Sequence, residues 1–448
     1  KSKYLAQGEE ALKNANNPDW KPKWLPAQKD QGPYLRSVME IARIHQADAK
    51  GIPYESKMLV ELDATASGSQ HIGAQYGDTE ILWQTGVISD KVKLLTNDEL
   101  RLIQDGVPAD SIARDLYGDV GNKYWSGINN AFEQIAQTDP QKALLLKEYT
   151  SKYMSGGRST VKPIVMKVPY GAGDGTLKKD LVSQLSGRQQ LEMAQKGLDP
   201  EELMDFHWNT MQDALQDGLK TQYEFKEFNK AIGDIYGGKV DKKKGYIGYS
   251  NRKPLVIDGP FGGKTDLTRY IMKSKEQQIT FRGELTPDLT PNKQGLTKTS
   301  VYTQNGVDDF GVQGVKGVKG FNKGIELDAQ QTRQGLAPNI THSMDAAYLH
   351  KLVEAADANG IEVRAIHDAF LVHPNDVNAM KKIAGQVFQE MHSNYNVRDA
   401  MIKGLADAVG EDVSYIRAAL QNKGINLDTA MDIGNVPTEQ LSNVIRGG

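Results

Sequence analysis

The chain has 448 residues, which leaves room for about two to four domains of ordinary size. Hydrophobic residues make up 39% and charged residues 25%, as in soluble globular proteins, and no stretch approaches the ~20 apolar residues that a membrane helix needs. Cysteine is absent, so disulfide frameworks, cysteine-ligated zinc, iron–sulfur clusters and thiol catalysis are excluded. The formal net charge of −3 argues mildly against nucleic acid as a partner, although local basic patches would still be compatible with one.

The first predicted elements lead to an acidic residue at a strand end. Residues 1–33 are rich in Asn, Pro, Lys and Gln and indicate an irregular arm with short helical pieces. Apolar residues then recur at helical spacing over 34–50, and Gly51 is expected to end this helix. The apolar run 57–63 has the length of a strand and ends at Asp63, before the small residues ATASGS.

The middle of the chain is predicted to be mainly helical. Polar and apolar residues alternate at helical period over 78–155, with helices expected around 97–116 and 123–149. A Gly-flanked helix is expected within 156–175, and a further helical stretch covers 188–235.

The stretch 236–325 differs in composition, because glycine is frequent and short β-like runs appear (GYIGYS, KPLVID and QQITFRG). We therefore expect a loop-rich region. It is also locally basic, through Lys239, Lys242, Lys243, Lys244, Arg252 and Lys253. This cluster has two interpretations of similar weight, a contact with template or promoter phosphates and a solvated flexible loop.

The last part of the chain is predicted to hold a hairpin between helices. A helix is expected over 343–358, strands over 361–368 and 370–373, and a second helix over 375–393. The last 50 residues are expected to be helical and polar.

Two aspartates, Asp63 and Asp368, thus end predicted strands that lie far apart in the sequence. Either residue alone is more typical of a cap or a turn. On neighbouring strand ends, however, they are what a two-metal site needs, since Mg²⁺ prefers oxygen ligands and is often bound by one or two carboxylates plus substrate phosphates.

A second candidate site is a cationic row. Arg158 and Lys162 are four residues apart and share one face of a helix, and Met166 and Tyr170 continue the row at the same step. Such a row could hold a triphosphate with a base and sugar beyond it. A bare Arg/Lys pair is more often a solvated basic stripe.

Four blocks of sequence, taken together, indicate a function more specifically than the aspartate pair or the cationic pair does alone. They are DATASGSQH (63–71), RSTVKPIVMKVPYG (158–171), APNITHSMDAAYL (337–349) and HDAFLVHP (367–374). In this order they resemble motif A, motif B, the palm helix and motif C of the single-subunit, phage-type RNA polymerase family, which includes mitochondrial relatives. The resemblance covers roughly residues 35–395.

The resemblance implies a role for each matching residue. Asp63 and Asp368 match the two aspartates that hold two Mg²⁺ ions in the family. Arg158 and Lys162 match the residues that contact the phosphates of the incoming nucleotide, and Lys162 is expected to be catalytic as well.

The sugar-binding residues follow from the same resemblance. Tyr170 matches the tyrosine that senses the ribose 2′-hydroxyl and is expected to take part in catalysis, and His342 matches the histidine that joins the same network. His367 precedes the motif C aspartate as in the family, and Gly68 lies inside motif A.

Three positions favour RNA synthesis over the related family A DNA polymerases. Those enzymes carry a Glu where this chain has Gly68, a Phe where it has Met166, and His-Asp-Glu where Ala369 follows the His-Asp pair. The alternatives are a family A DNA polymerase fragment and a catalytically inactive nucleic-acid-binding subunit. The presence of both aspartates and of the cationic pair argues against the second.

Motif B departs from a regular helix at two prolines. Pro163 is tolerable if the helix begins near Ser159, where first-turn amides are unpaired anyway. Pro169 predicts a kink or a helix end just before Tyr170.

The resemblance implies an α+β fold: a right-hand polymerase with a small antiparallel palm sheet and mostly helical fingers, lacking the N-terminal domain and thumb. Residues 1–85 are expected to form the arm and the palm segment with motif A. Residues 86–335 would form the fingers with motif B and the basic loop region, and 336–448 the palm segment with motif C and the C-terminal helices.

Only 62 residues precede Asp63, whereas the family has a long part before motif A. We therefore expect a smaller second subunit that supplies the N-terminal palm and thumb, the alternative being a fragment of a longer chain. Other partners implied are a DNA template, nascent RNA, ribonucleoside triphosphates and a single-stranded DNA-binding or promoter-recruiting factor, with no membrane. The expected location is the cytoplasm of an infected bacterial host.

Overall fold

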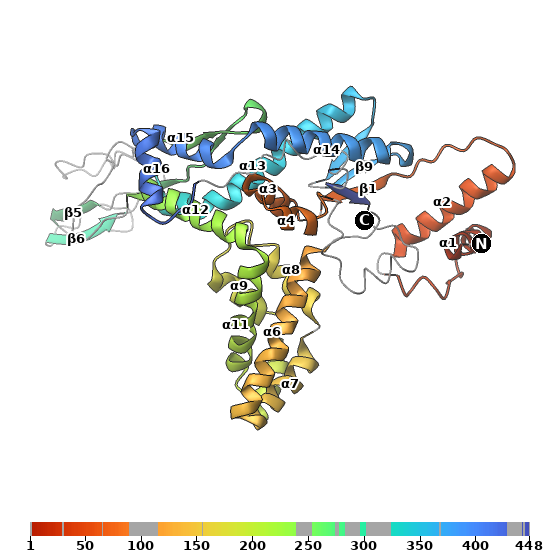
Figure 1. Cartoon of the computed structure of the whole chain (residues 1–448), viewed down its shortest axis with the longest axis horizontal. Helices are drawn as coiled ribbons and strands as arrows, with labels where there is room; N and C mark the ends of the chain where they lie inside the picture. Colours follow the sequence, from red (N-terminus) through yellow and green to blue (C-terminus); the bar gives the residue numbers. More distant parts are fainter. Residues whose placement is uncertain are drawn as a thin grey trace. The chain divides into compact units, whose positions relative to one another are not determined.

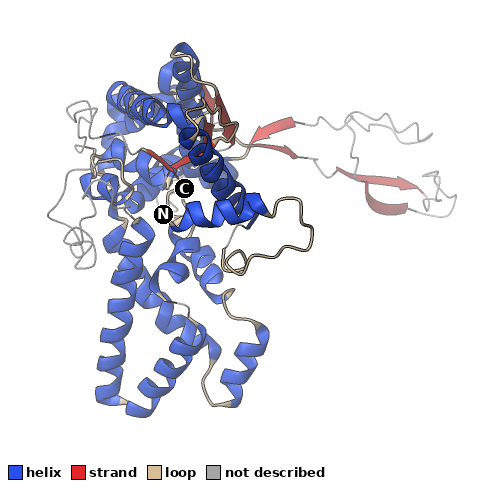
Figure 2. Cartoon of the chain, turned by 90° about the vertical axis from the view of Figure 1, so that its right-hand side faces the viewer, coloured by secondary structure: helices blue, strands red, loops and turns tan. Residues whose placement is uncertain are grey.

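The computed structural model describes residues 2–28, 31–64, 66–88, 115–154, 156–238, 253–273, 277–282, 296–301, 324–366, 369–427, 441 and 444–447. These residues are mostly helical, with short antiparallel strands (Figure 2), so the predicted α+β class is confirmed. The chain divides into two compact units. The first contains residues 1–223, 341–396 and 428–448, and the second contains 224–340 and 397–427.

The arm at the start of the first unit is a pair of packed helices, α1 (Lys3–Lys13) and α2 (Gln31–Ala49) (Figure 1). They approach closely at Gly8, where an added Cβ would lie 1.9 Å from the carbonyl oxygen of Val38. After α2 the chain turns at Gly51, whose φ of +64° suits glycine. The predicted helix and its end are therefore confirmed.

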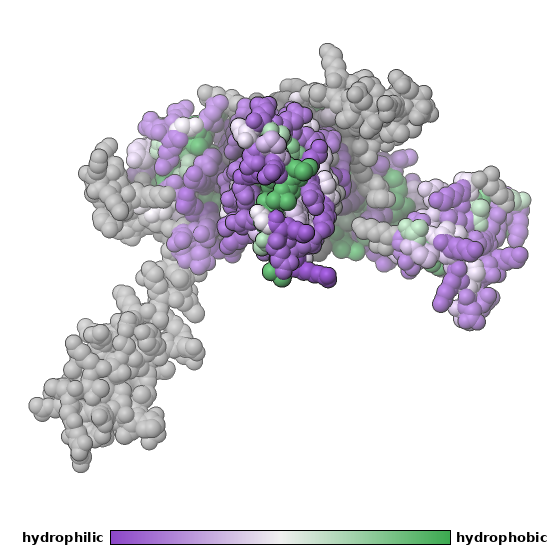
Figure 3. All heavy atoms as spheres, turned by 90° about the horizontal axis from the view of Figure 1, so that it is seen from below, coloured by the Kyte–Doolittle hydropathy of each residue, from purple (hydrophilic) through white to green (hydrophobic). Residues whose placement is uncertain are grey.

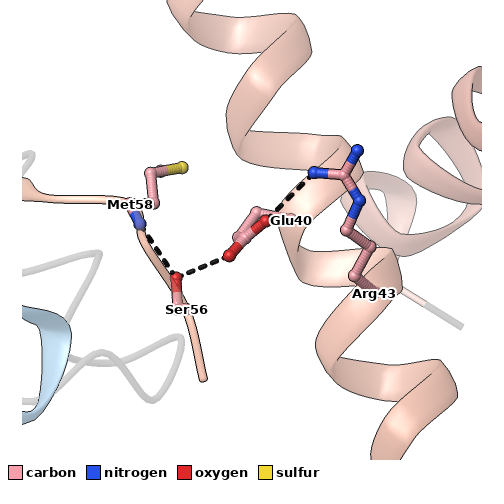
Figure 4. A network of polar contacts seen from close by, with 4 residues as sticks. All are labelled: Glu40, Arg43, Ser56 and Met58. Atoms are coloured by element: carbon pink, nitrogen blue, oxygen red, sulfur yellow. Dashed lines mark hydrogen bonds and ion pairs between the residues drawn. The ribbon is translucent and has the colours of Figure 1, made fainter. Parts of the chain in front are cut away.

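A polar network holds the segment that leads from α2 toward the first strand (Figure 4). The Ser56 hydroxyl donates to Glu40 Oε1 (2.6 Å) and accepts from the Met58 amide (3.2 Å), while Arg43 Nη1 lies 3.3 Å from Glu40 Oε2. Burial raises the pKa of Glu40, but hydrogen bonds from Ser56, Tyr54 and Arg43 outweigh it and leave this pKa below its ordinary value. Glu40 is therefore a buried, ionised anchor for this segment.

The sheet of the first unit has four antiparallel strands in the order β10-β1-β9-β8. The strands are β1 (Val60–Ala64), β8 (Val363–Ile366), β9 (Ala369–Val372) and β10 (Ile445–Gly447). β1 pairs with β9 so that Leu62 faces Phe370 and Asp63 faces Ala369. The two predicted strand regions that carry the aspartates are therefore neighbours.

Helices of the first unit pack around this sheet: α3 (Ser67–Tyr76), α4 (Thr79–Gln84), α14 (Val377–Asn394) and the residues of α13 (Ala329–Ala358) from Thr341 onward. The prediction that this last helix starts at 343 was wrong, since it starts at Ala329 and passes through Pro338. Burial of Leu336 and Ile340 on either side of the proline explains why the helix continues there.

A helical bundle forms the rest of the first unit (Figure 1). Its helices are α6 (Leu116–Thr138), α7 (Pro140–Tyr153), α8 (Gly157–Val165), α9 (Asp174–Val182), α10 (Gly187–Gln195) and α11 (Pro200–Gly218), which share one buried apolar core. The single helix predicted over 123–149 is in fact two. The break is at Asp139, whose carboxylate accepts from the Lys142 amide and starts α7 with Pro140 in its first turn. Most of the helix predicted at 97–116 lies outside the described residues.

A histidine is buried inside this bundle. His207 of α11 is fully buried, with Nδ1 2.6 Å from the Tyr124 hydroxyl of α6 and Nε2 2.9 Å from the Thr150 hydroxyl of α7. Both hydroxyls can donate or accept, so either neutral tautomer is satisfied. Burial lowers the pKa of His207 to about 4 and raises that of Tyr124. The three helices are thus joined by one neutral hydrogen-bonded group.

The second unit combines helices with three two-stranded antiparallel sheets. It contains most of α12 (Lys220–Gly237), the pairs β2 (Val256–Asp258) with β3 (Lys264–Asp266), β4 (Tyr270–Lys273) with β7 (Gly324–Leu327) and β5 (Gln277–Arg282) with β6 (Leu296–Val301), and helices α15 (Val397–Val409) and α16 (Val413–Gln421). Two of the three predicted β-like runs are strands. The third, GYIGYS, lies outside the described residues, as do Lys239, Lys242, Lys243, Lys244 and Arg252.

Most of the described surface seen from below is hydrophilic, with only small hydrophobic areas (Figure 3). Among the described helices, none has both the length and the apolar character required to cross a bilayer.

The buried His207 predicts a pH dependence of stability. Its pKa is about 4 in the folded chain and about 6.5 when unfolded, so between these values the unfolded chain binds more protons. The free energy of unfolding should therefore fall as the pH is lowered from 6.5 to 4, by up to about 3 kcal/mol from this residue. Urea unfolding across this range measures the change. The control His207→Gln cannot titrate and should show a shallower fall, whereas parallel curves would contradict the assignment.

Candidate active site

Asp63 lies on the exposed side of β1, between the buried residues Leu62 and Ala64. Across the sheet it faces Ala369, the first residue of β9. Its predicted companion Asp368 and the neighbouring His367 lie outside the described residues, so the geometry of the two carboxylates is not described. What the fold establishes is that Asp63 faces the residue that directly follows Asp368 in the sequence.

The turn after β1 carries backbone strain. Ala66 has φ +57° and ψ +59°, a left-handed conformation that costs a non-glycine residue about 1–2 kcal/mol. Its carbonyl oxygen accepts from the amides of Ser69 (2.8 Å) and Gln70 (3.1 Å), which starts α3 at Ser67, four residues after Asp63. Gln70 Nε2 in turn donates to the carbonyls of Thr85 (3.3 Å) and Val444 (3.1 Å), so this motif A residue fastens α3 to its neighbours.

Gly68 is buried where three segments meet. A Cβ added there would lie 2.9 Å from Thr341 Cγ2, 3.2 Å from Pro169 Cβ and 3.3 Å from Tyr170 Cζ. Thr341 Oγ1 donates to the Pro169 carbonyl (3.1 Å), and the rings of Tyr170 and His342 lie 4.8 Å apart between centroids. The predicted residues Gly68, Tyr170 and His342 are therefore brought together.

A cavity of about 310 Å³ opens beside these residues. Tyr170, His342 and Asp345 line it, together with Ala64 and Phe370 from the two paired strands. The cavity thus connects the strand that carries Asp63 with the Tyr170–His342 pair.

A buried chain of hydrogen bonds supports the wall of this cavity. Gln75 Nε2 donates to the Tyr395 carbonyl (2.9 Å), which can only accept, and this fixes the orientation of the Gln75 amide. The same Nε2 lies 2.7 Å from His392 Nδ1, which must then accept, so His392 donates from Nε2 to His71 Nδ1 (2.9 Å). His71 Nε2 then carries the ring proton and lies 3.3 Å from Asp345 Oδ1, close enough for an electrostatic contact but without the geometry of a hydrogen bond.

This series of hydrogen bonds requires that His392 be neutral. The residue is buried, and its pKa lies well below the ordinary value because burial and the neighbouring His71 both disfavour the charged form. Among the described residues that line the cavity, Asp345 is the one with a carboxylate; its side chain is 22% exposed, so it can accept from a bound hydroxyl group.

The cationic pair lies on α8, as predicted. Arg158 forms an ion pair with Asp115, and its guanidinium carbon lies 5.8 Å from the centre of the Tyr117 ring. Lys162 Nζ lies 5.4 Å from the same ring centre. Both cations are therefore held by the first turn of α6.

The two motif B prolines differ in their position relative to α8. α8 begins at Gly157, so the condition of a helix start near Ser159 is not met and Pro163 lies inside the helix. The helix ends at Val165, and turns carry the chain from Met166 to Gly171. The predicted helix end before Tyr170 is thus confirmed.

Sequence reasoning missed four polar residues, Asp115, Tyr117, Asp345 and His392. Asp345 was within reach, because it lies three residues after His342 and so on the same helical face. The others depend on contacts between segments far apart in the sequence, which no local pattern reports. Within the described residues no group of three or more acidic or histidine side chains could hold a metal ion; Asp63 is the one described member of the predicted pair.

Comparison with known proteins identifies the family of the chain. The sequence profile of the family described as DNA-dependent RNA polymerase matches residues 3–430. The chain belongs to this family, in its phage-type branch. It is similar to the T7 RNA polymerase of Escherichia phage T7, with 23% identity over 90% of the chain and 42% of that protein.

Two further relatives show how wide this branch is. The mitochondrial DNA-directed RNA polymerase of Neurospora crassa is 22% identical over 85% of the chain and 25% of its own length. The DNA-directed RNA polymerase of Enterobacteria phage K11 is 24% identical over 86% of the chain and 37% of its own length. The chain therefore spans less than half the length of these relatives.

The contacts of Gly68 predict that no side chain fits there. Gly68→Ala should lower the free energy of unfolding by about 1–3 kcal/mol, because the added Cβ must displace Thr341 or Tyr170. Gly175→Ala is a matched control, since it also occupies the second position of a helix and has no atom within 4 Å of an added Cβ. Thermal denaturation should show a lower midpoint for the first variant alone, and equal midpoints would contradict the packing.

Proposed function

We propose that this chain carries the catalytic site of a DNA-directed RNA polymerase and catalyses template-directed nucleotidyl transfer from ribonucleoside triphosphates. The observation that supports this most strongly is the pairing of β1 with β9, in which Asp63 faces the residue after Asp368. Family membership and the cavity bounded by Tyr170, His342 and Phe370 agree with it.

Asp63 and Asp368 are the residues proposed to hold two Mg²⁺ ions. The donor set fits, because carboxylate oxygens are preferred by Mg²⁺ and the Asp63 side chain is exposed on β1. When bound, such ions would activate the primer 3′-hydroxyl and stabilise the charge on the leaving pyrophosphate.

The other residues bind and orient the nucleotide. Arg158 and Lys162 place two positive charges on one helix face and would neutralise the triphosphate. Lys162, with an ammonium that can donate three hydrogen bonds, can also supply a proton to a leaving phosphate oxygen. His367, next to Asp368 in the sequence, is proposed to contact the substrate from the same hairpin.

Selection of ribonucleotides is proposed to depend on the group formed by Tyr170, His342 and Gly68. The Tyr170 hydroxyl and the His342 ring can both bond to a ribose 2′-hydroxyl, and the absence of a side chain at Gly68 leaves Tyr170 in place. A DNA polymerase of family A would have a glutamate at this position, for which the contacts of Gly68 leave no room.

We further propose the right-hand architecture, with residues 1–85 and 336–448 contributing to the palm and 86–335 to the fingers. The remainder, including an N-terminal palm part and thumb, would come from a smaller second subunit. The exposed apolar side chains Ile41 (41%) and Ile44 (44%) on α2, with Ile52 and Tyr54 after it, support a protein partner at the arm. Transcription of phage genes in the host cytoplasm, with DNA, RNA and a promoter-recruiting factor as partners, completes this proposal.

The first test removes the proposed metal ligands. Asp63→Asn and Asp368→Asn should each lower Mg²⁺-dependent ribonucleotide incorporation by at least about three orders of magnitude, equal to about 4 kcal/mol of transition-state stabilisation. Glu61→Gln is the matched control, since Glu61 is exposed on the same side of β1. The assay uses the full chain with any chain that co-purifies. Activity retained by Asp368→Asn would favour the inactive-subunit alternative.

The second test concerns sugar selection. Tyr170→Phe should lower the preference for ribonucleotides over deoxyribonucleotides by roughly tenfold, the value of one hydrogen bond. Tyr153→Phe, which removes a hydroxyl that bonds to Glu192 in the bundle, should leave the preference unchanged. Efficient deoxyribonucleotide use by the unmodified chain would instead support the DNA polymerase alternative.

A further inference from the structure

The contact between α6 and α8 is close enough to fix the position of Arg158. A Cβ added to Gly121 of α6 would lie 2.7 Å from the Arg158 amide nitrogen and 2.7 Å from the Gly157 carbonyl carbon. A Cβ added to Gly157 would lie 2.4 Å from the Gly121 carbonyl oxygen. The two backbones therefore touch, and the start of α8 lies directly against α6.

Asp115 precedes α6 at the position where an aspartate usually caps a helix. Its backbone is extended (φ −144°, ψ 91°), as a cap requires, yet its carboxylate accepts no amide of the first turn. Instead Oδ2 accepts from Arg158 Nε, and Oδ1 lies 3.4 Å from Arg158 Nη2. The carboxylate is thus directed to the arginine and not to the helix end.

This contact uses only part of the guanidinium group. Arg158 has five N–H donors in a flat fork, and Asp115 occupies the side formed by Nε and Nη2. Within the part of the chain that the structure describes, no second carboxylate pairs with Arg158, so the side formed by Nη1 and Nη2 can take a second anion; the Arg158 side chain is 54% exposed. An ion pair this exposed adds little to stability, so its main physical effect is on the orientation of the arginine.

The Tyr117 ring constrains both cations at once. It lies beneath the Arg158 guanidinium and within 5.4 Å of Lys162 Nζ, distances at which a ring face attracts a cation. Asp115 and Tyr117 together therefore fix two positive charges that lie one helical turn apart on α8.

We propose that Asp115 and Tyr117 are positioning residues for the nucleotide triphosphate, which hold Arg158 and Lys162 in the arrangement that binds its phosphates. This inference rests on the proposed function of the two cations. Preorganised donors bind phosphate without a cost of ordering, so the loss of either support should weaken nucleotide binding more than it slows the chemical step.

The test compares four variants in single-nucleotide addition, using the full chain with any co-purifying chain. Asp115→Asn and Tyr117→Leu should raise the KM for ribonucleotide about five- to tenfold with kcat changed less than about twofold. Tyr117→Phe keeps the ring, so its KM should equal that of the unmodified protein. Asp180→Asn is the control, since it removes a comparable exposed ion pair with Lys167, 2.8 Å long, outside the cationic pair.

Two outcomes would overturn the inference. An unchanged KM in Asp115→Asn would mean that the ion pair has no part in binding. A lowered KM would mean that Asp115 competes with the phosphates for Arg158.

Calorimetric titration with inorganic tripolyphosphate separates this inference from the proposed function. Weaker tripolyphosphate binding by Asp115→Asn, together with no incorporation by the unmodified protein, would retain the inference and reject the polymerase function. Normal incorporation by the unmodified protein, with equal tripolyphosphate binding by all variants, would retain the polymerase function and reject the inference.

Discussion

The antiparallel pairing of β1 with β9 is the constraint on which the candidate site depends. These strands lie about 300 residues apart in the sequence, and Asp63 reaches the neighbourhood of motif C only through their register. A slip of one residue would turn Asp63 to the opposite face of the sheet, because side chains alternate along a strand. The register must therefore be held from outside the four residue pairs of the ladder.

Several polar contacts hold the register of β1 against β9. His373, just after β9, donates from Nε2 to the Ser56 carbonyl (2.9 Å), and Ser56 is also bonded to the buried Glu40. The segment before β1 is thus fastened both to α2 and to the end of its partner strand. On the other side, Gln70 joins α3 to the segment before β10. These contacts are buried or partly buried, where a hydrogen bond lost without replacement is costly.

The sequence predicted the parts of this arrangement that depend on local patterns. Strand-length apolar runs located β1, β8 and β9, and helical periodicity with Gly51 located α2 and its end. The grouping of Gly68, Tyr170 and His342 was expected from family motifs and not from spacing. Local rules failed where tertiary burial or a distant partner decided the outcome. Pro338 lies inside α13, and Asp115 binds Arg158, a contact across 43 residues that no local pattern predicts.

The most direct test of the central claim is cleavage of the chain by Fe²⁺ bound in place of Mg²⁺, since hydroxyl radicals formed there cut only the nearby backbone. If Asp63 and Asp368 share one metal site, cuts should appear both near residue 63 and near residue 369, and excess Mg²⁺ should suppress both together. Cuts at only one of these segments, or cuts that Mg²⁺ does not suppress, would contradict a shared metal site built on the pairing of β1 with β9.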